Sequence, residues 1–295
     1  MSGHMFFFGF GNVARALARR LRADGWRLSG TAREAVGLDR LAVEAVRGHL
    51  FNEARPLPPH ALAGVSHLLI SIPPGDGGDV ALEAAGDMIR EAAAHLRWVG
   101  YLSTVGVYGD HGGAWVDETT PPAPVSERGR RRLMAERQWL ALHEETGLPV
   151  HIFRLPGIYG PHSSPLKKAL AGQSRIVVKE GQVFSRIHLD DLVAALAASI
   201  AQPTPGEIYN VTDDAPAPPH EVALFAHELL GLAPPPRVAF AEAELSDMAR
   251  SFYGESKRVS NAKLKERLGW RPAYPDYKAG LRALKRTLEE AEDDE

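Results

Sequence analysis

The chain has 295 residues, a net charge of -3 and no cysteine. Its hydrophobic content of 44% and charged content of 24% are typical of a globular protein with one large domain or two joined ones. The lack of cysteine excludes disulfides, thiolate zinc sites and cysteine nucleophiles, and the small net charge gives no indication of a nucleic-acid partner.

No apolar run approaches the ~20 residues of a membrane-spanning helix. The sequence enters a strand almost at once, which leaves no room for a signal peptide. We therefore expect a cytoplasmic protein without a membrane partner, and the absence of cysteine fits that location. The 12 histidines are scattered without the His-x-x-x-His pairing of a helical metal site, so we expect no metal.

The chain opens with a short apolar run, from Met5 to Phe8, that predicts a buried strand ending at Gly9. Asn12 is the expected N-cap of a helix whose apolar residues recur at helical spacing, at positions 13, 17 and 21. A strand, then Gly-x-Gly-x-x-Ala, then a helix is the order of a dinucleotide-binding turn.

The chemistry of such a turn explains its residue types. Gly9 can adopt the backbone angles of the sharp turn, and Gly11 has no side chain to keep a pyrophosphate away. The amides at the helix start, at Asn12 and Val13, then hold the phosphate charge with the positive end of the helix dipole. Ala14 allows close packing of the helix on the strand. The alternative is an ordinary glycine turn.

The second predicted strand covers residues 26–32 and ends just before Arg33. In this kind of fold an acidic residue here would bind the ribose 2′-hydroxyl of NAD. None is present, whereas an arginine can bind a 2′-phosphate through its planar fork. We therefore expect NADP as cofactor, with NAD as the alternative; a solvated loop arginine is the other interpretation of Arg33.

Strands and helices alternate through the next 100 residues or so, which predicts an α/β fold with a Rossmann-type, doubly wound parallel sheet. Further strands are expected at 43–51, 65–72, 98–103 and 150–155, with helices at 80–96 and 128–145. Ser71 lies near the carboxyl end of the strand at 65–72 and Pro73 directly follows it, so both are expected at the cofactor edge of the sheet.

From about residue 162 the elements become shorter and less regular. We expect a dinucleotide-binding domain at 1–161 and, interleaved with it, a smaller C-terminal α/β substrate-binding portion at 162–295. The expected elements here are a hairpin from 175–179 and 183–188, a helix capped by Asp190 and Asp191, a strand at 207–211, helices at 219–230, 242–250, 260–268 and 277–290, and a solvated acidic tail at 289–295.

Several motifs in this order resemble the extended short-chain dehydrogenase/reductase superfamily, in its NAD-dependent epimerase/dehydratase branch. The likeness runs from the first strand to about residue 282. Its motifs are Ser-Thr-Val-Gly-Val-Tyr-Gly at 103–109, Asp-Glu at 117–118, Arg-Leu-Pro-Gly-Ile-Tyr-Gly-Pro at 154–161, Arg-Ile-His-Leu-Asp-Asp at 186–191, Ile-Tyr-Asn-Val at 208–211 and Leu-Gly-Trp-Arg-Pro at 268–272. The resemblance places Thr104 at the family's catalytic serine position.

Two features depart from the family pattern. The first turn is one residue shorter than the usual Gly-x-x-Gly-x-x-Gly, and the catalytic Tyr-x-x-x-Lys is missing. Arg128 stands at the tyrosine position and Arg132 at the lysine position, as in atypical subgroups that keep the nucleotide site. A guanidinium keeps its proton at any useful pH, so Arg128 cannot be the acid–base but could bind an anion. Arg132 could contact the nicotinamide ribose or a phosphate.

Two functions follow from this resemblance. The first is an NAD(P)-dependent epimerase/dehydratase-like oxidoreductase that acts on a small polar substrate such as a nucleotide sugar, with Thr104, Arg128 and Arg132 in its catalytic set. The second is a non-catalytic NADP(H)-binding sensor or regulatory protein. Relatives often form homodimers through helices such as those expected near 80–96 and 128–146, so a homodimer is expected as well. Tyr108, Asp117, Glu118, Tyr159 and His162 are the nearby substitute acids.

Overall fold

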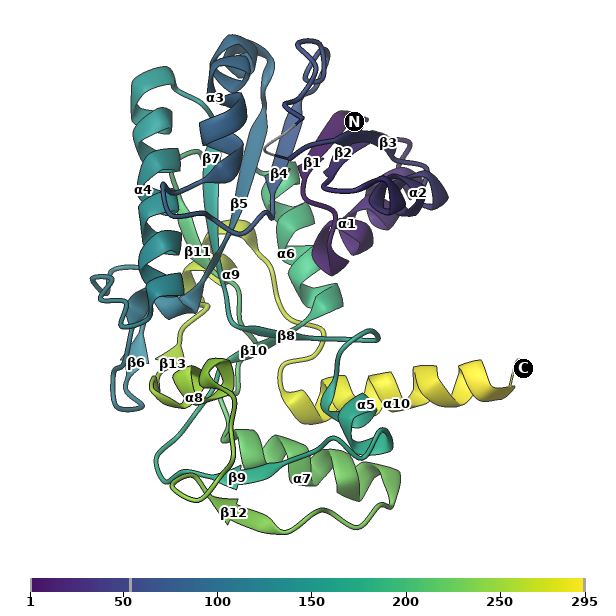
Figure 1. The fold of residues 1–295 in the computed structure, drawn as a ribbon, viewed down its shortest axis with the longest axis vertical. Coiled ribbons are helices and arrows are strands. Elements are labelled where there is room, and N and C mark those ends of the chain that lie inside the picture. The colour runs from purple at the N-terminus through teal and green to yellow at the C-terminus, as the bar shows by residue number, and fades with distance from the viewer. Residues whose placement is uncertain (1, 53–54, 294–295) are drawn as a thin grey trace. The chain divides into compact units, whose positions relative to one another are not determined.

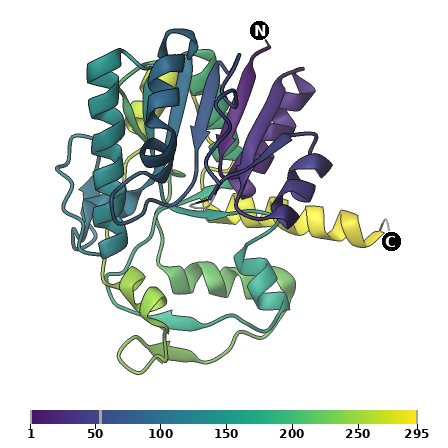
Figure 2. The same ribbon diagram turned by 45° about the horizontal axis from the view of Figure 1, so that its top comes forward.

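A computed structural model describes residues 2–52 and 55–293 of the chain. They form two compact units whose segments interleave along the sequence (Figures 1 and 2). The first unit comprises Met1–Thr104, Glu127–Arg154 and Val193–Tyr209, and the second Val105–Ser126, Leu155–Leu192 and Asn210–Glu295. The expected boundary at residue 161 falls inside the second unit. The division into a dinucleotide-binding domain at 1–161 and a substrate-binding portion at 162–295 stays a prediction. The expected acidic tail ends in residues 294–295, outside the described part.

A seven-stranded parallel sheet forms the centre of the first unit and confirms the predicted Rossmann-type α/β fold. Its order is β11-β7-β5-β4-β1-β2-β3, so the chain builds outward from β1 in both directions. The strands are β1 (His4–Phe8), β2 (Arg27–Ala32), β3 (Arg47–Leu50), β4 (His67–Ile70), β5 (Trp98–Thr104), β7 (Val150–Leu155) and β11 (Ile208–Asn210).

Helices cover the sheet because each one has an apolar stripe. They are α1 (Asn12–Ala23), α2 (Ala35–Val43), α3 (Val80–Ala92) with the short 3-10 turn η1 (Ala93–His95), α4 (Glu127–Thr146) and α6 (Leu189–Ala201). Both ribbon views show α3 beside α4 (Figures 1 and 2). These two helices bury Ile89 and Trp139 with Phe6 and Phe8 of β1 in one core cluster.

Two expectations for the first unit are wrong in detail. The N-cap of α1 is Gly11, with an extended ψ of -169°, and Asn12 is already the first helical residue. The third strand begins at Arg47 rather than at 43, because α2 extends to Val43 before the chain turns.

A buried ion pair joins α4 to two strands of the first unit. Glu136 accepts from Arg154 of β7 at 2.8 Å, and both side chains are at most 3% exposed. The Ser103 hydroxyl of β5 donates to the same carboxylate. Because α4, β5 and β7 share one buried charge network, the position of α4 is fixed relative to the ends of these strands.

The second unit contains three two-stranded sheets, all parallel, and several helices. Its strand pairs are β10 (Arg186–His188) with β8 (Gly157–Tyr159), β12 (Arg237–Ala239) with β9 (Ile176–Val178), and β13 (Arg258–Val259) with β6 (Trp115–Val116). Its helices are η2 (Val105–Tyr108), α5 (Pro165–Leu170), α7 (Pro219–Leu230), α8 (Asp247–Tyr253), α9 (Ala262–Leu268) and α10 (Tyr277–Asp293).

The hairpin expected from 175–179 and 183–188 is wrong, because β9 and β10 pair with other strands rather than with each other. The expected cap of α6 is also different. Asp191 accepts from the amides of Ala273 and Tyr274, at 2.7 and 3.0 Å, and the Asp190 amide donates to His188 Nδ1 at 3.2 Å. The carboxylate of Asp191 therefore holds a distant loop of the chain instead of its own helix.

One carboxyl group of the second unit is almost completely buried. Asp213 is 1% exposed, and its Oδ1 accepts from the Ala215 amide at 3.3 Å, while Oδ2 has no hydrogen-bond partner among the described residues. Burial raises the pKa of Asp213 to about 8, although Arg186 nearby acts in the opposite direction.

We predict that Glu136→Gln lowers the free energy of unfolding by about 3–5 kcal/mol, because it leaves the buried Arg154 without its counter-charge. Urea titration followed by circular dichroism measures the loss. The matched control is Arg90→Gln, whose partners Asp87 and Glu145 are exposed and lie at 3.6 Å. That variant should lose less than about 1 kcal/mol. Equal losses in the two variants would contradict the prediction.

We also predict that Asp213→Asn flattens the pH dependence of stability. The folded protein keeps this proton up to about pH 8, whereas the unfolded chain releases it near 3.8. The contribution of Asp213 is therefore complete below about pH 4 and is lost as the pH rises towards 8, by up to about 1.4 kcal/mol per pH unit. Urea titrations at several pH values should show the wild type losing stability relative to the variant. The exposed Asp247→Asn should keep the wild-type slope, and an unchanged slope in Asp213→Asn would refute the prediction.

Candidate nucleotide-binding site

The carboxyl ends of the central strands bring the predicted cofactor residues to one edge of the first unit. Phe8 of β1 lies opposite Ile70 of β4, and Ile70 lies opposite Tyr101 of β5. Gly9 and Ser71 are therefore the next residues on neighbouring strands. In open parallel sheets this edge is where ligands bind, at the point where the strand order reverses.

Two hydroxyl groups lock the turn at Gly9. Its amide donates to Thr31 Oγ1 at 2.9 Å, and its carbonyl accepts from Ser71 Oγ at 3.1 Å. Gly9 has a φ of +88°, and a Cβ there would lie 2.9 Å from Ser71 Oγ. Only glycine fits this position, because both the backbone angle and the hydroxyl exclude a side chain.

The start of α1 is suited to a bound anion. A Cβ on Gly11 would meet nothing within 4 Å, so the main chain can be approached closely here. Gly11 provides no capping side chain, and the first turn of α1, which begins at Asn12 and Val13, contains no acidic residue. The positive end of the helix is thus left without a side-chain counter-charge, as a pyrophosphate site requires.

Arg33 and Pro73 lie at the ends of β2 and β4. Arg33 is the residue after Ala32 and is exposed, and its carbonyl accepts from Asn52 Nδ2 at 2.7 Å. This contact fixes the backbone and leaves the guanidinium to the solvent side. Pro73 is exposed and opens the loop that leads to α3.

Helix α4 holds the loop that follows Pro73. Gln138 accepts from the Asp79 amide at 2.8 Å and donates to the Gly77 carbonyl at 3.0 Å. Arg131 pairs with Asp76 at 2.6 Å. The loop is therefore fixed at three points along its length, which shapes the wall of the sheet edge.

The predicted catalytic positions have different environments. Thr104 ends β5 and is half-buried. Arg132 is also half-buried: its Nη1 donates to the Leu102 carbonyl at 2.6 Å and lies 3.3 Å from the Tyr101 hydroxyl. Arg128, in the first turn of α4, is exposed. The structure brings Arg132 to the end of β5, while the roles of Thr104, Arg128 and Arg132 stay predictions.

The substitute acids named from the sequence all belong to the second unit. The Tyr108 hydroxyl donates to Asn210 Oδ1 at 2.8 Å, which ties the 103–109 motif to the 208–211 motif. Glu118 accepts from the Asn210 amide at 2.7 Å, and burial raises the pKa of its carboxyl group. A hydrogen bond from the Thr119 side chain lowers the pKa of Asp117.

The remaining two candidates differ in exposure. Tyr159 is buried, its hydroxyl has no hydrogen-bond partner, and burial raises the pKa of its phenol. His162 is exposed. Glu118 is the carboxyl group among these candidates that combines partial burial with a raised pKa, the combination expected of a proton donor.

Sequence reasoning missed Thr31 and Gln138. The signal for Thr31 was its position, because a hydroxyl one residue before the end of the second strand lies beside the first turn in a parallel pair. Gln138 had no such signal, since its partners are 59 and 61 residues away. Within residues 2–52 and 55–293, no three acidic or histidine side chains gather as a metal site, and no helix has the length and apolarity to cross a bilayer.

Comparison with known proteins identifies the lineage. Residues 73–212 match the model of the NAD dependent epimerase/dehydratase family. The matched segment, just under half of the chain, carries the domain of this family. Protein YeeZ of Escherichia coli K12 is 29% identical over 279 residues, which cover 91% of this chain and 95% of YeeZ.

Solved structures of similar proteins support the family fold. A functionally unknown conserved protein from Silicibacter pomeroyi is 51% identical, with a TM-score of 0.91 over 97% of this chain and 99% of the other. The dTDP-glucose 4,6-dehydratase from Bacillus anthracis, solved in complex with NAD, is 17% identical, with a TM-score of 0.78 over 99% and 98% of the two chains. The match of residues 73–212 to the NAD dependent epimerase/dehydratase family supports an oxidoreductase-like function.

We predict that Thr31→Val weakens the binding of a nicotinamide dinucleotide, because the Gly9 amide loses its acceptor and the turn loosens. A loss of about 1 kcal/mol corresponds to roughly fivefold in affinity. Nucleotide fluorescence titration measures the change. Thr31→Ser keeps the hydroxyl and should bind like the wild type. Wild-type affinity in Thr31→Val would show that this contact does not shape the site.

Proposed function

We propose that this protein is an NADP(H)-dependent oxidoreductase that acts on a small polar substrate of the nucleotide-sugar class. The observation that carries the proposal is the turn from Gly9 to Gly11, which two hydroxyls hold in place and which leads into an uncapped helix. The dinucleotide, when bound, supplies the hydride chemistry. The family match supports the reaction class, and the dehydratase with NAD bound supports the substrate class.

Different residues of the first unit bind different parts of the dinucleotide in this proposal. The amides at the start of α1 hold the pyrophosphate, while Gly11 lets it approach the main chain. Arg33, beyond β2, binds the 2′-phosphate of NADP with its planar guanidinium. Ser71 and Pro73 line the sheet edge between these groups and Thr104.

The proton step has to differ from that of the family's tyrosine. A hydride that moves to or from a carbon bearing oxygen requires a proton to move on that oxygen. Arg128 and Arg132 keep their protons, so they bind or orient a negative group rather than exchange one. Thr104 donates a hydrogen bond to the substrate oxygen in this proposal, and the proton comes from a carboxyl, phenol or imidazole of another segment.

A non-catalytic NADP(H) sensor is the second candidate. The observation in its favour is the position of Arg132, whose Nη1 is used by the Leu102 carbonyl at 2.6 Å. A group used to hold the end of β5 cannot replace the family's lysine without breaking this bond. In both candidates we propose a homodimer, formed through α3 and α4.

The two candidates separate in one experiment. The purified chain is titrated with NADP and NADPH and is then assayed with a panel of carbonyl compounds and nucleotide sugars. Turnover of one substrate class supports the enzyme. Tight cofactor binding with no turnover across the panel supports the sensor, and weak binding of both cofactors refutes both.

We predict that Arg33→Ala weakens NADPH binding about tenfold or more, because the 2′-phosphate loses a charged, bidentate partner. NADH lacks that phosphate and should change less than about twofold. Parallel fluorescence titrations measure both constants. Arg40→Ala, an exposed arginine of α2, is the matched control and should leave both constants unchanged. Equal losses for the two cofactors would remove the argument for NADP.

A further inference from the structure

The amino edge of the central sheet, opposite the cofactor edge, carries its own row of polar side chains. Arg27 of β2 lies opposite His4 of β1. The Ser66 amide donates to the His4 carbonyl at 3.0 Å, and the Arg97 amide donates to the Ser66 carbonyl at 2.8 Å. These four residues are neighbours in register at the amino ends of four adjacent strands, with Ser66 and Arg97 one residue before β4 and β5. Their side chains therefore leave the same face of the sheet, because the faces alternate along each strand.

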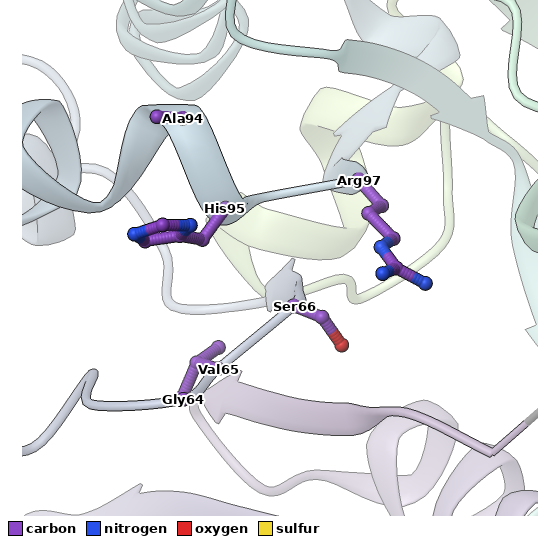
Figure 3. A pocket seen from close by; sticks show the side chains of 6 residues that line it. All are labelled: Gly64, Val65, Ser66, Ala94, His95 and Arg97. Atoms are coloured by element: carbon purple, nitrogen blue, oxygen red, sulfur yellow. The ribbon is translucent and has the colours of Figure 1, made fainter.

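A hollow of about 380 Å³ opens at this row, and its volume is within the range of small-molecule sites. It is lined by Gly64, Val65, Ser66, Ala94, His95 and Arg97. Figure 3 shows the side chains of Ser66 and Arg97 extending to the same side, while His95 extends to the other. The guanidinium of Arg27 approaches from β2, with Nη2 at 4.0 Å from where a Cβ of Gly64 would lie.

Among the residues that the structure describes, no carboxylate balances these cations. In the described part of the chain neither Arg27 nor Arg97 forms an ion pair or a side-chain hydrogen bond. Arg97 does not cap the preceding helix end either, because its guanidinium donates to no carbonyl in the described structure, whereas the Leu96 amide donates to the Ala92 and Ala93 carbonyls at 3.2 and 3.3 Å. The two guanidinium groups are free to take an external partner.

Two histidines near this row, His4 and His67, add no positive charge to it at pH 7. Burial, and next Arg97, lower the pKa of His67 to about 4. Burial, and next Arg27, lower the pKa of His4. Both rings are therefore neutral at pH 7, and the local potential comes from the arginines. The backbone amides and the Ser66 hydroxyl of the row already form hydrogen bonds within the sheet. The guanidinium groups of Arg27 and Arg97 are therefore the groups that can bind a ligand.

We propose that this hollow is a second ligand site, separate from the dinucleotide edge, and that it binds a phosphate group through Arg97, with Arg27 approaching from β2. A planar guanidinium can donate two parallel hydrogen bonds to two oxygens of a phosphate. Such charge-assisted hydrogen bonds are stronger than hydrogen bonds between neutral groups. The volume leaves room for an organic body on the phosphate. Inorganic phosphate and a phosphate monoester share this chemistry.

The test is calorimetric titration of the full-length protein at low ionic strength. Inorganic phosphate and glycerol 3-phosphate are the two probes, and tighter binding of one identifies the source of the phosphate. We expect a dissociation constant below about 1 mM for at least one probe. Arg97→Gln should weaken it about tenfold or more, and Arg97→Lys, which keeps the charge but not the fork, should give a smaller loss.

The controls separate this site from the cofactor turn. Arg137→Gln, at an exposed position of α4, should bind the probe like the wild type. NADPH titration of Arg97→Gln should give the wild-type constant and report that the variant is folded. Nuclear magnetic resonance of the His95 ring should show a shift on addition of the probe. Phosphate binding of wild-type strength in Arg97→Gln, or no binding up to several millimolar, would overturn the proposal.

Discussion

The parallel register of β1 with β2 and β4 is the constraint on which the candidate site depends. It places the last residue of β1, Phe8, opposite Ile70, so that Gly9 emerges between Thr31 and Ser71. A shift of one residue would turn these hydroxyls to the other face of the sheet. The apolar, fully buried side chains of β1 prevent such a shift, because each has its own place in the core. Core packing and cofactor geometry are thus determined by the same pairing.

Residues of helix α4 make structural contacts at positions where the family carries catalytic residues. The family carries its catalytic tyrosine and lysine here, whereas this chain has Arg128 and Arg132. Arg132 binds the end of β5, Glu136 binds Arg154 of β7, and Gln138 holds the loop before α3. Through these contacts the helix holds β5, β7 and the loop before α3 in place at the carboxyl edge of the sheet. These contacts would preserve the geometry of a dinucleotide site both in an enzyme and in a non-catalytic protein.

The two edges of the sheet differ in the origin of their positive potential. At the carboxyl edge it comes from the main chain, through the uncapped start of α1. At the amino edge, where helices end and their dipoles are negative, it comes from the side chains of Arg27 and Arg97. Arginines that only balanced helix ends would contact the terminal carbonyls, and Arg97 makes no such contact in the described structure.

The sequence by itself determined the alternation of strands and helices, the fold class and the glycine turn, because these depend on local apolar periodicity and on the backbone freedom of glycine. It failed for the expected hairpin at 175–188, since β9 and β10 pair with segments distant in sequence. Only the tertiary structure decided the partners of Thr31, Arg132, Glu136 and Asp191, and the position of Arg97 at the hollow of the amino edge. These contacts join residues that are 18 to 83 positions apart, and no local pattern records which distant strand or loop will lie beside a given side chain.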